Sequence, residues 1–317
     1  MSRLSEQLVA YIEMRRALGA KLGEPALTLR GLVELIEREG GETVTAALAL
    51  RWATASTGVQ PSTWSRKLGH VRGFATWLSV TDPRTEIPSW HLLAARHRRK
   101  APHIYTDEEM SKLMAEANNL RSPKGLRAAT HRTLIGMLAA TGLRPGEALA
   151  LDVSDVDLEK GILNVRWTKF GKSRFVPVEE SARQALVQYA EVRDRLFADH
   201  HSHAFLVSER GKRLGSSAAR RAFAILSKDI GLRPPPAKAR RLGQGPRLQD
   251  IRHTFATRRL IEWYRAGLDV SRLLPGLMTY LGHASIQSTY WYIQAVPELL
   301  QLASKRGITC PTDGICQ

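Results

Sequence analysis

The spacing of hydrophobic residues changes once along this chain, between residues 153 and 178. Within that stretch, the segments 156–158, 162–167 and 174–178 are short and carry β-branched and aromatic residues, which is typical of strands. The second and third segments are joined by a short turn, Lys169-Phe-Gly-Lys172, as in a hairpin. The sequence therefore predicts a three-stranded antiparallel sheet within an otherwise helical chain.

Elsewhere, apolar residues recur at helical spacing. The helices predicted from this spacing cover residues 3–19, 25–39, 44–55, 61–80, 107–119, 127–141, 179–198, 217–229, 250–266, 269–281, 285–295 and 297–305, and residues 205–207 form a short extended piece. The first four helices are expected to form a small bundle. The predicted fold class is thus mainly α with a small antiparallel β-sheet.

A domain boundary is predicted at residues 82–104, where Pro83, Pro88 and Pro102 interrupt the helical pattern and a basic cluster occupies 96–100. Thr106 and Glu109 have the spacing of a helix capping box, so a second domain is expected to begin there. We therefore predict a helical domain over residues 1–100 and a second domain over residues 105–317.

The chain is strongly basic, with 47 Lys and Arg against 30 Asp and Glu, a net charge of +17 and a pI near 10.4. Such a charge favours nucleic acid as a partner over a merely soluble basic protein. In the first domain Arg66, Lys67 and Arg72 are candidate DNA contacts, although a simple packing domain is an equal alternative. The linker adds three basic candidates, Arg98, Arg99 and Lys100.

Only two cysteines occur, Cys310 and Cys316, both near the C-terminus, which argues against a disulfide framework and against a zinc site. The N-terminal residues lack the apolar core of a signal peptide, and no apolar run is long enough to span a bilayer. No P-loop and no acidic metal-binding cluster is apparent. We therefore expect a cytoplasmic protein that is not bound to a membrane and needs no metal or cofactor.

Three motifs, followed by a tyrosine, suggest the chemistry: Thr141-Gly-Leu-Arg144-Pro-Gly-Glu147, Asp250-Ile-Arg252-His-Thr-Phe-Ala256, and Leu281-Gly-His283 with Tyr292 nine residues later. In this order and spacing they resemble the motifs of the tyrosine recombinases, which include phage integrases, Xer-type resolvases and transposon-encoded integrases. The resemblance covers most of residues 101–300. It implies an N-terminal SAM-like core-binding domain followed by an α+β catalytic domain.

The resemblance also implies roles for individual residues. Arg144 and Arg252 would bind the oxygens of a DNA phosphate, since guanidinium groups bind such oxygens bidentately and stabilise the charge of the transition state. Tyr292 would be the nucleophile, with Tyr290 and Tyr280 as local rivals. His283 would donate a hydrogen bond to the phosphate, although a helix-capping histidine is the alternative. Lys169, rather than its neighbour Lys172, would protonate the leaving 5′ hydroxyl.

One position departs from the family pattern. Gln249 stands three residues before Arg252, where the family usually has histidine. Glutamine can orient a phosphate or a hydroxyl group, but it cannot accept a proton as histidine can. His253 follows Arg252 directly and is expected to project into packing. A slower enzyme or an inactive one is therefore the expectation.

The resemblance implies a site-specific DNA recombinase that cleaves and rejoins strands through a 3′-phosphotyrosyl intermediate, in DNA integration or transposition. Its partner would be a double-stranded DNA recombination site, bound by a homotetramer or by a hetero-tetramer with a related recombinase. Alternatives are an accessory DNA-binding protein of the same fold, weakened by Gln249, and a monomeric type IB topoisomerase. Further predicted DNA contacts are Lys172, Arg174, Arg240 and Arg241.

Overall fold

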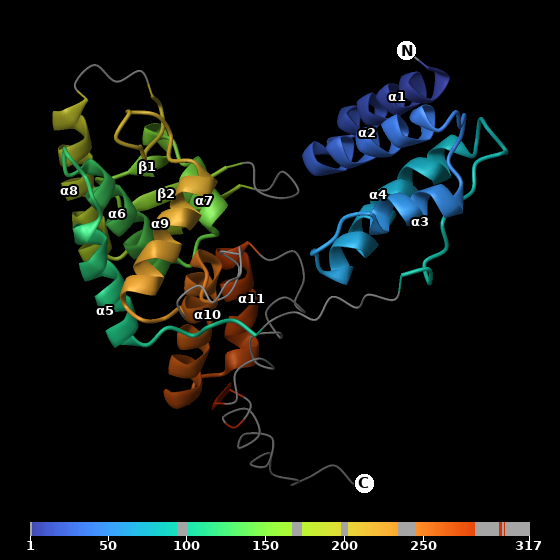
Figure 1. Ribbon diagram of the computed structural model, residues 1–317. Coiled ribbons are helices and arrows are strands. Elements are labelled where there is room, and N and C mark those ends of the chain that lie inside the picture. The colour runs from blue at the N-terminus through green and yellow to red at the C-terminus, as the bar shows by residue number, and fades with distance from the viewer. Residues whose placement is uncertain are drawn as a thin grey trace, which may run out of the picture. The chain divides into compact units, whose positions relative to one another are not determined.

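The structure is a computed structural model that describes residues 2–93, 101–166, 173–197, 202–233, 245–282, 298–299 and 301. The chain divides into two compact units, residues 1–100 and 101–317. Each unit buries an apolar core of its own, and each is described here separately (Figure 1).

Four helices form the first unit, as the apolar spacing predicts. They are α1 (Arg3–Ala17), α2 (Gly23–Arg38), α3 (Ala46–Thr54) and α4 (Pro61–Leu78). Their buried faces carry apolar side chains, of which Leu32, Ile36, Leu68 and Phe74 are fully enclosed. Burying such side chains stabilises the bundle by roughly 1.5 to 3 kcal/mol each.

The second unit contains the remaining elements. They are α5 (Asp107–Glu116), η1 (Ala117–Asn119), α6 (Leu126–Thr141), α7 (Pro145–Ala150), η2 (Val153–Asp155), β1 (Val156–Asp157), β2 (Ile162–Val165), β3 (Arg174–Pro177), α8 (Glu180–Leu196), α9 (Ser216–Asp229), α10 (Leu248–Arg265) and α11 (Val270–Leu281). The predicted capping box is present at the start of α5, where the Thr106 hydroxyl accepts from the Glu109 amide at 3.1 Å.

The three strands form an antiparallel sheet in the order β1-β2-β3, as predicted. Leu163 of β2 lies opposite Val176 of β3, and both side chains are buried. The alternation of buried and more exposed positions along β2 places one face of the sheet on the core. The extended piece predicted at residues 205–207 is also present, between two isolated bridges that join Ala204 to Asp152 and Val207 to Arg213.

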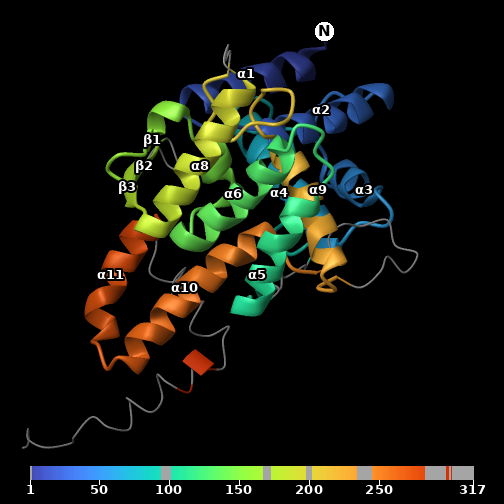
Figure 2. The ribbon, with the colours of Figure 1, turned by 90° about the vertical axis from the view of Figure 1, so that its left-hand side faces the viewer.

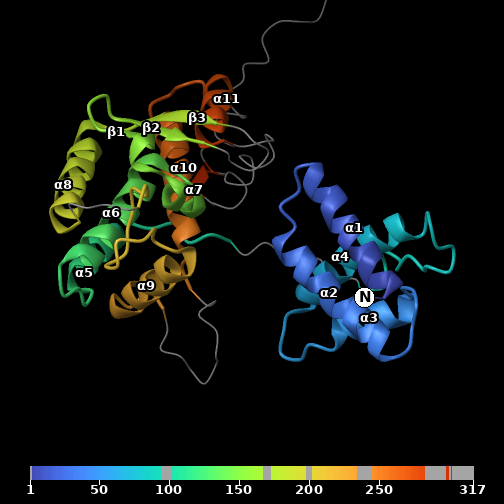
Figure 3. The ribbon, with the colours of Figure 1, turned by 90° about the horizontal axis from the view of Figure 1, so that it is seen from above.

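Helix α6 is the central element of the second unit (Figure 2). It packs against α5, α8, α9 and α10, so its sides are covered by other helices. Strand β3 contacts the helix α11, which lies beside that edge of the sheet (Figure 3). The ends of α6 and α11 and the start of β3 are thereby brought into one region, although they are far apart in sequence.

Of the two predicted C-terminal helices, the first lies outside the described residues, and of the second only 298–299 and 301 are described. Leu299 is fully buried in the same chain, in a cluster with Leu260, Leu274 and Leu281. Beside it, Arg265 pairs with Glu298 at 2.6 Å. This part of the C-terminal segment therefore packs against α10 and α11 of its own chain.

Candidate active site

Arg144 lies at the entrance of the short helix α7, as the sequence predicts. Helix α6 ends at Gly142, and α7 begins at Pro145, whose ring suits the first helical position because no N–H is needed there. Arg144 is the N-cap residue between them and has extended backbone angles. Its side chain is 35% exposed, which leaves the guanidinium accessible to a ligand.

Arg252, in contrast, is almost completely buried, with 1% of its surface exposed. Its Nη1 donates to the carbonyl oxygen of Gly142 at 2.9 Å, and its Nη2 donates to that of Leu281 at 2.7 Å. A buried charge persists when it is paired and hydrogen-bonded, as it is here. Arg252 thus joins the last turn of α6 to the last turn of α11.

Glu147 is the carboxylate that these cations share. Arg144 Nη1 donates to its Oε1 at 2.6 Å, and the Arg144 backbone N–H donates to its Oε2 at 3.0 Å. Arg252 Nη1 lies 3.9 Å from Oε2. Arg174, the first residue of β3, adds two hydrogen bonds, at 2.8 and 3.3 Å. Glu147 therefore holds three guanidinium groups in one arrangement.

The electrostatics of Glu147 follow from this arrangement. Burial by itself would raise the pKa of the carboxyl group, but the hydrogen bonds and charges of Arg174 and Arg144 outweigh it, so the pKa is lowered. The carboxylate is consequently ionised at neutral pH. Three arginines against one carboxylate leave an excess of two positive charges at this point, which suits a site for an anion such as a phosphate.

Two glycines permit this close approach. Gly142 and Gly282 end α6 and α11 in the left-handed region, with φ of 61° and 67°. A β-carbon at Gly142 would lie 2.5 Å from the Phe255 ring, and one at Gly282 would lie 2.8 Å from Arg174 Nη1. Only glycine therefore fits both the backbone conformation and the space at these two helix ends.

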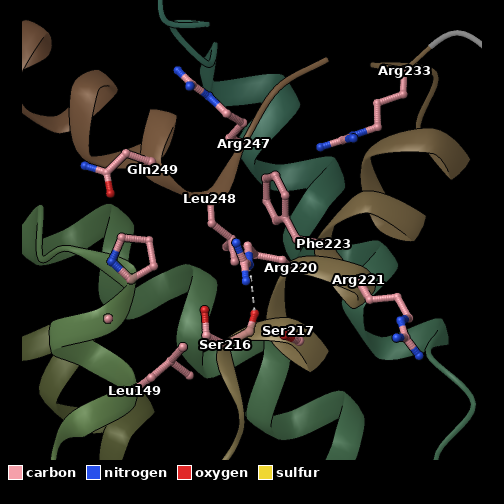
Figure 4. A pocket seen from close by; sticks show the side chains of 12 residues that line it. Leu149, Ser216, Ser217, Arg220, Arg221, Phe223, Arg233, Arg247, Leu248 and Gln249 are labelled. Carbon is pink, nitrogen blue, oxygen red and sulfur yellow. Dashed lines mark hydrogen bonds between the residues drawn. The ribbon is translucent and has the colours of Figure 1, made fainter. Parts of the chain in front are cut away.

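Gln249 lies in the first turn of α10, which begins two residues earlier than predicted. It lines a cavity of about 580 Å³ beside α7 and α9, together with Pro145 and Gly146, the first two residues of α7. Figure 4 shows its amide at one side of this cavity, with the basic side chains of Arg220 and Arg221 on the α9 side. Gln249 thus lies close in space to the start of α7, the helix that Arg144 caps.

His253 and Tyr280 are packing residues, as the sequence allowed. His253 is largely buried, and burial lowers its pKa to about 4, so it is a neutral packing residue at physiological pH. Tyr280, a rival for the nucleophile, stacks on Phe255 with ring centroids 5.8 Å apart. Burial raises the pKa of its hydroxyl group, which makes Tyr280 a poor nucleophile.

Several predicted residues lie outside the described part of the chain. They are Arg98, Arg99, Lys100, Lys169, Lys172, Arg240, Arg241, His283, Tyr290 and Tyr292. In sequence, Arg166 and Arg174 lie on either side of the segment that contains Lys169 and Lys172, and Gly282 immediately precedes His283.

The predicted DNA contacts of the first unit differ in exposure. Arg66 is exposed and pairs with Glu24 at 3.0 Å, and Lys67 donates to the Ser56 hydroxyl at 2.6 Å. The prediction for Arg72 is wrong. Its side chain is buried and donates to the carbonyl oxygens of Pro88 and Ser89 at 2.8 and 2.9 Å, so it holds the segment that follows α4.

The sequence predicted Arg174 as a DNA contact and indicated Glu147 only as the last residue of the Arg144 motif. The structure places both at the centre of the arginine cluster. The signal available in the sequence was the spacing Arg-x-x-Glu at a helix entrance, which permits a carboxylate to accept from the N-cap amide. The contact with Arg174 has no local signal, because it joins residues 27 positions apart.

Among the described residues no group of three or more His, Cys, Asp or Glu side chains could hold a metal ion. None of the helices in the described part of the chain is long and apolar enough to cross a membrane.

The fold is shared by DNA-recombining enzymes. The structure of the Tn1549 transposon integrase in complex with transposon right end DNA superposes with a TM-score of 0.65 at 18% identity, over 96% of this chain and 99% of that one. A lambda integrase tetramer bound to a Holliday junction superposes with a TM-score of 0.58 at 18% identity, over 89% and 77% of the two chains. The chain therefore has the fold of these integrases.

Sequence comparison assigns the family. The phage integrase family profile matches residues 104–298. The putative integrase/recombinase y4rB of Sinorhizobium fredii is 41% identical over 313 residues, covering 96% of this chain and 97% of the relative. The tyrosine recombinase XerC of Chlorobaculum tepidum is 29% identical over 248 residues, covering 74% and 70%. The chain belongs to the phage integrase family and is a site-specific, DNA strand-transferring recombinase.

Proposed function

We propose that this recombinase cleaves and rejoins DNA through Tyr292, with Arg144 and Arg252 as the phosphate-binding pair. The observation that carries the proposal is the meeting of these two arginines around Glu147, at the end of the helix that leads to His283. Their guanidinium groups are held in advance of DNA binding, which is how fixed donors stabilise a transition state most effectively.

The reaction is an exchange of esters. The Tyr292 oxygen attacks the phosphorus, the bond from phosphorus to the 5′ oxygen breaks, and a 3′-phosphotyrosyl link forms. The phenolic proton is lost, and the released 5′ oxygen takes up a proton, which we assign to Lys169. In the second half, a 5′ hydroxyl of the partner strand attacks the phosphotyrosine and restores both groups. Because the bond energy is kept in the covalent link, the cycle needs no nucleotide cofactor and no metal.

Gln249 has a limited role in this scheme. Its amide can donate a hydrogen bond to a phosphate oxygen or accept one from a hydroxyl group, but it cannot remove the phenolic proton. Loss of that proton to water would replace the base. The cationic excess around Glu147 supports this, because nearby positive charge favours phenolate over phenol. His283 would complete the hydrogen bonds to the phosphate.

DNA binding would extend beyond the cleaved phosphate. We assign phosphate contacts to Arg66 and Lys67 of the first unit, to the linker, and to the basic segments that contain Lys172, Arg240 and Arg241. We retain the division into a core-binding domain over residues 1–100 and a catalytic domain over residues 105–317. The protein would act on DNA in the cytoplasm.

A tetramer is the proposed working assembly, because exchange needs two cuts on each of two duplexes. An apolar groove of about 530 Å³ between β3, α10 and α11 supports a contact between subunits. It is lined by Pro177, Phe255, Leu277 and Tyr280, and it could receive the C-terminal segment of a neighbouring copy. The lambda integrase tetramer bound to a Holliday junction is consistent with this. The relative y4rB is a putative integrase/recombinase, and the structural neighbour from Tn1549 is a transposon integrase, which favours integration or transposition as the process.

The test uses duplexes from the DNA that flanks the gene, chosen because they contain inverted repeats with a short spacer. A nick is placed near the cleavage site so that the short fragment with the released 5′ hydroxyl group diffuses away. We expect the wild-type protein to form a covalent adduct that resists denaturation, and Tyr292→Phe to form none. Tyr290→Phe is the matched control and should retain the adduct.

The outcomes separate the alternatives. An absent wild-type adduct on a duplex that the protein binds specifically would support the accessory DNA-binding protein. An adduct without strand exchange between two duplexes, together with relaxation of supercoiled DNA, would support a topoisomerase. An adduct that persists in Tyr292→Phe but is lost in Tyr290→Phe would identify Tyr290 as the nucleophile.

A further inference from the structure

The last turn of α11 is bound by three arginines from three different elements. Arg174 of β3 donates from Nε to the Tyr280 carbonyl oxygen at 2.7 Å, Arg252 of α10 donates to Leu281, and Arg144 of α7 donates to Gly282 at 3.0 Å. These consecutive carbonyls are among the last four of the helix, which have no partner within it. They also carry the negative end of the helix dipole, so cations are favoured there.

Arg174 is held by protein acceptors on both sides of its guanidinium group. Its side chain is only 11% exposed, and both Nη atoms bind the Glu147 carboxylate while Nε binds Tyr280. Its guanidinium also lies against Gly282, where a β-carbon would come within 2.8 Å of Nη1. The donors of Arg174 thus point into the protein on two sides.

We propose that Arg174 is a positioning residue that fixes the β2–β3 hairpin against the phosphate-binding arginines and the end of α11, and that it makes no direct contact with DNA. The inference rests on the proposed function. Arg174 is the first residue of β3 and follows the connection that contains Lys169, the assigned acid. A clamp at this point would set the distance between that connection and the phosphate bound by Arg144 and Arg252.

The chemistry predicts which step depends on such a clamp. An error of about 1 Å in the placement of a catalytic group can lower a rate about 100-fold. A misplaced acid lowers the rate of the step in which the 5′ oxygen leaves, because an alkoxide that is not protonated is a poor leaving group. A 5′ sulfur in the same bridging position leaves as a thiolate, since thiols have a pKa of about 8.5, and it needs no acid.

The experiment measures single-turnover cleavage of two nicked duplexes, one with the natural 5′ oxygen and one with a bridging 5′ sulfur at the cleaved position. We expect Arg174→Ala and Arg174→Lys to cleave the oxygen substrate about 10- to 100-fold more slowly than wild type, and the sulfur substrate within about threefold of it. Lysine should fail to substitute because it cannot bind Glu147 and Tyr280 at once with one planar group.

Arg166 provides the matched control. It lies at the other end of the same connection and pairs with Asp152 and Asp155. Arg166→Ala should cleave both substrates at the wild-type rate. Equal losses on the oxygen and sulfur substrates in Arg174→Lys, or an equal loss in Arg166→Ala, would overturn the positioning role.

A second measurement separates positioning from DNA contact. Removing a phosphate contact lowers the slope of log affinity against log salt concentration by about 0.9 for duplex DNA. We expect the slope for Arg174→Lys and Arg174→Ala to equal that of wild type, and a lower slope in Arg174→Ala would overturn the inference. If the wild-type protein forms no Tyr292 adduct on either substrate, the proposed function fails; if it forms one and only the pattern of variants differs, the inference about Arg174 fails.

Discussion

Arg252 and Leu281 lie 29 residues apart in sequence, and a hydrogen bond of 2.7 Å joins the guanidinium of one to the carbonyl oxygen of the other. This bond fixes the end of α11 relative to Arg252, one of the two arginines proposed to bind the phosphate. Because His283 and Tyr292 follow that helix end in sequence, the segment that contains the proposed nucleophile follows a fixed point. The arginine cluster therefore holds the end of α11 in place, in addition to its proposed role in binding the phosphate.

Glu147→Gln should destabilise the catalytic unit by about 3 to 5 kcal/mol, because it leaves buried guanidinium charge without its carboxylate. The lowered pKa of Glu147 has the same origin: its stabilisation is present above the ordinary pKa of 4.5 and is lost as pH falls through the lower folded value. Calorimetric melting at pH 7 measures the effect. Glu108→Gln, which removes an exposed pair with Lys112, is the control and should melt as wild type does. An unchanged melting temperature in Glu147→Gln would contradict the prediction.

Gly282→Ala should lower stability by about 1 to 2 kcal/mol through its left-handed backbone alone, and it should slow cleavage because the new methyl group displaces Arg174. Gly276→Ala in the same helix meets no atom within 4 Å and should stabilise α11 slightly, since alanine favours helix. Thermal melting and the single-turnover assay measure the two effects. Equal melting temperatures for the two variants would show that Gly282 is not restricted by its backbone.

Arg72→Ala should lower the stability of the first unit, whereas Arg66→Ala should weaken DNA binding. Loss of the Arg72 hydrogen bonds leaves the carbonyl groups of Pro88 and Ser89 without these donors, and we expect a loss of about 1 to 3 kcal/mol in the first unit. Arg66→Ala should leave stability unchanged and lower the salt slope of DNA binding by about 0.9. Urea unfolding and salt-dependent binding distinguish them, and a reversed pattern would restore Arg72 as a DNA contact.

Gln249→His should keep or raise the rate of cleavage, since histidine can accept the phenolic proton that glutamine cannot. The variant should also acquire an acid limb near pH 6.5, the ordinary pKa of histidine, in its profile of rate against pH. Gln188→His, on the exposed face of α8, is the control and should leave the profile unchanged. Loss of cleavage in Gln249→His would show that Gln249 does not occupy the position of the family histidine.

His253 makes the catalytic unit sensitive to acid. Burial, with smaller contributions from Arg247 and Arg252, lowers its pKa from 6.5 to about 4, although Asp250 opposes the shift. Between these values the unfolded chain binds a proton that the folded chain does not, so stability falls as pH decreases, by at most about 3 kcal/mol at pH 4. Melting temperature against pH should be flatter for His253→Asn than for wild type. His91→Asn, at an exposed position, should follow the wild-type curve, and parallel curves for all three would contradict the prediction.

The sequence alone determined the order and type of the elements, because hydrophobic period, glycine and proline positions and capping residues act over a few neighbouring positions. The four helices of the first unit, the three strands and the helix entrance at Arg144 were all predictable in this way. The motifs around Arg144 and Arg252 also indicated the family and its chemistry.

Only the tertiary structure decided what each arginine does. Arg72 and Arg174 look in the sequence like any other basic residue available to DNA, yet one is buried under the end of the first unit and the other is bound to Glu147 and Tyr280. The physical reason is that a guanidinium group binds whichever acceptors the fold brings to it. For Arg174 those acceptors are a carboxylate 27 residues away and a helix-end carbonyl 106 residues away, which no local pattern encodes.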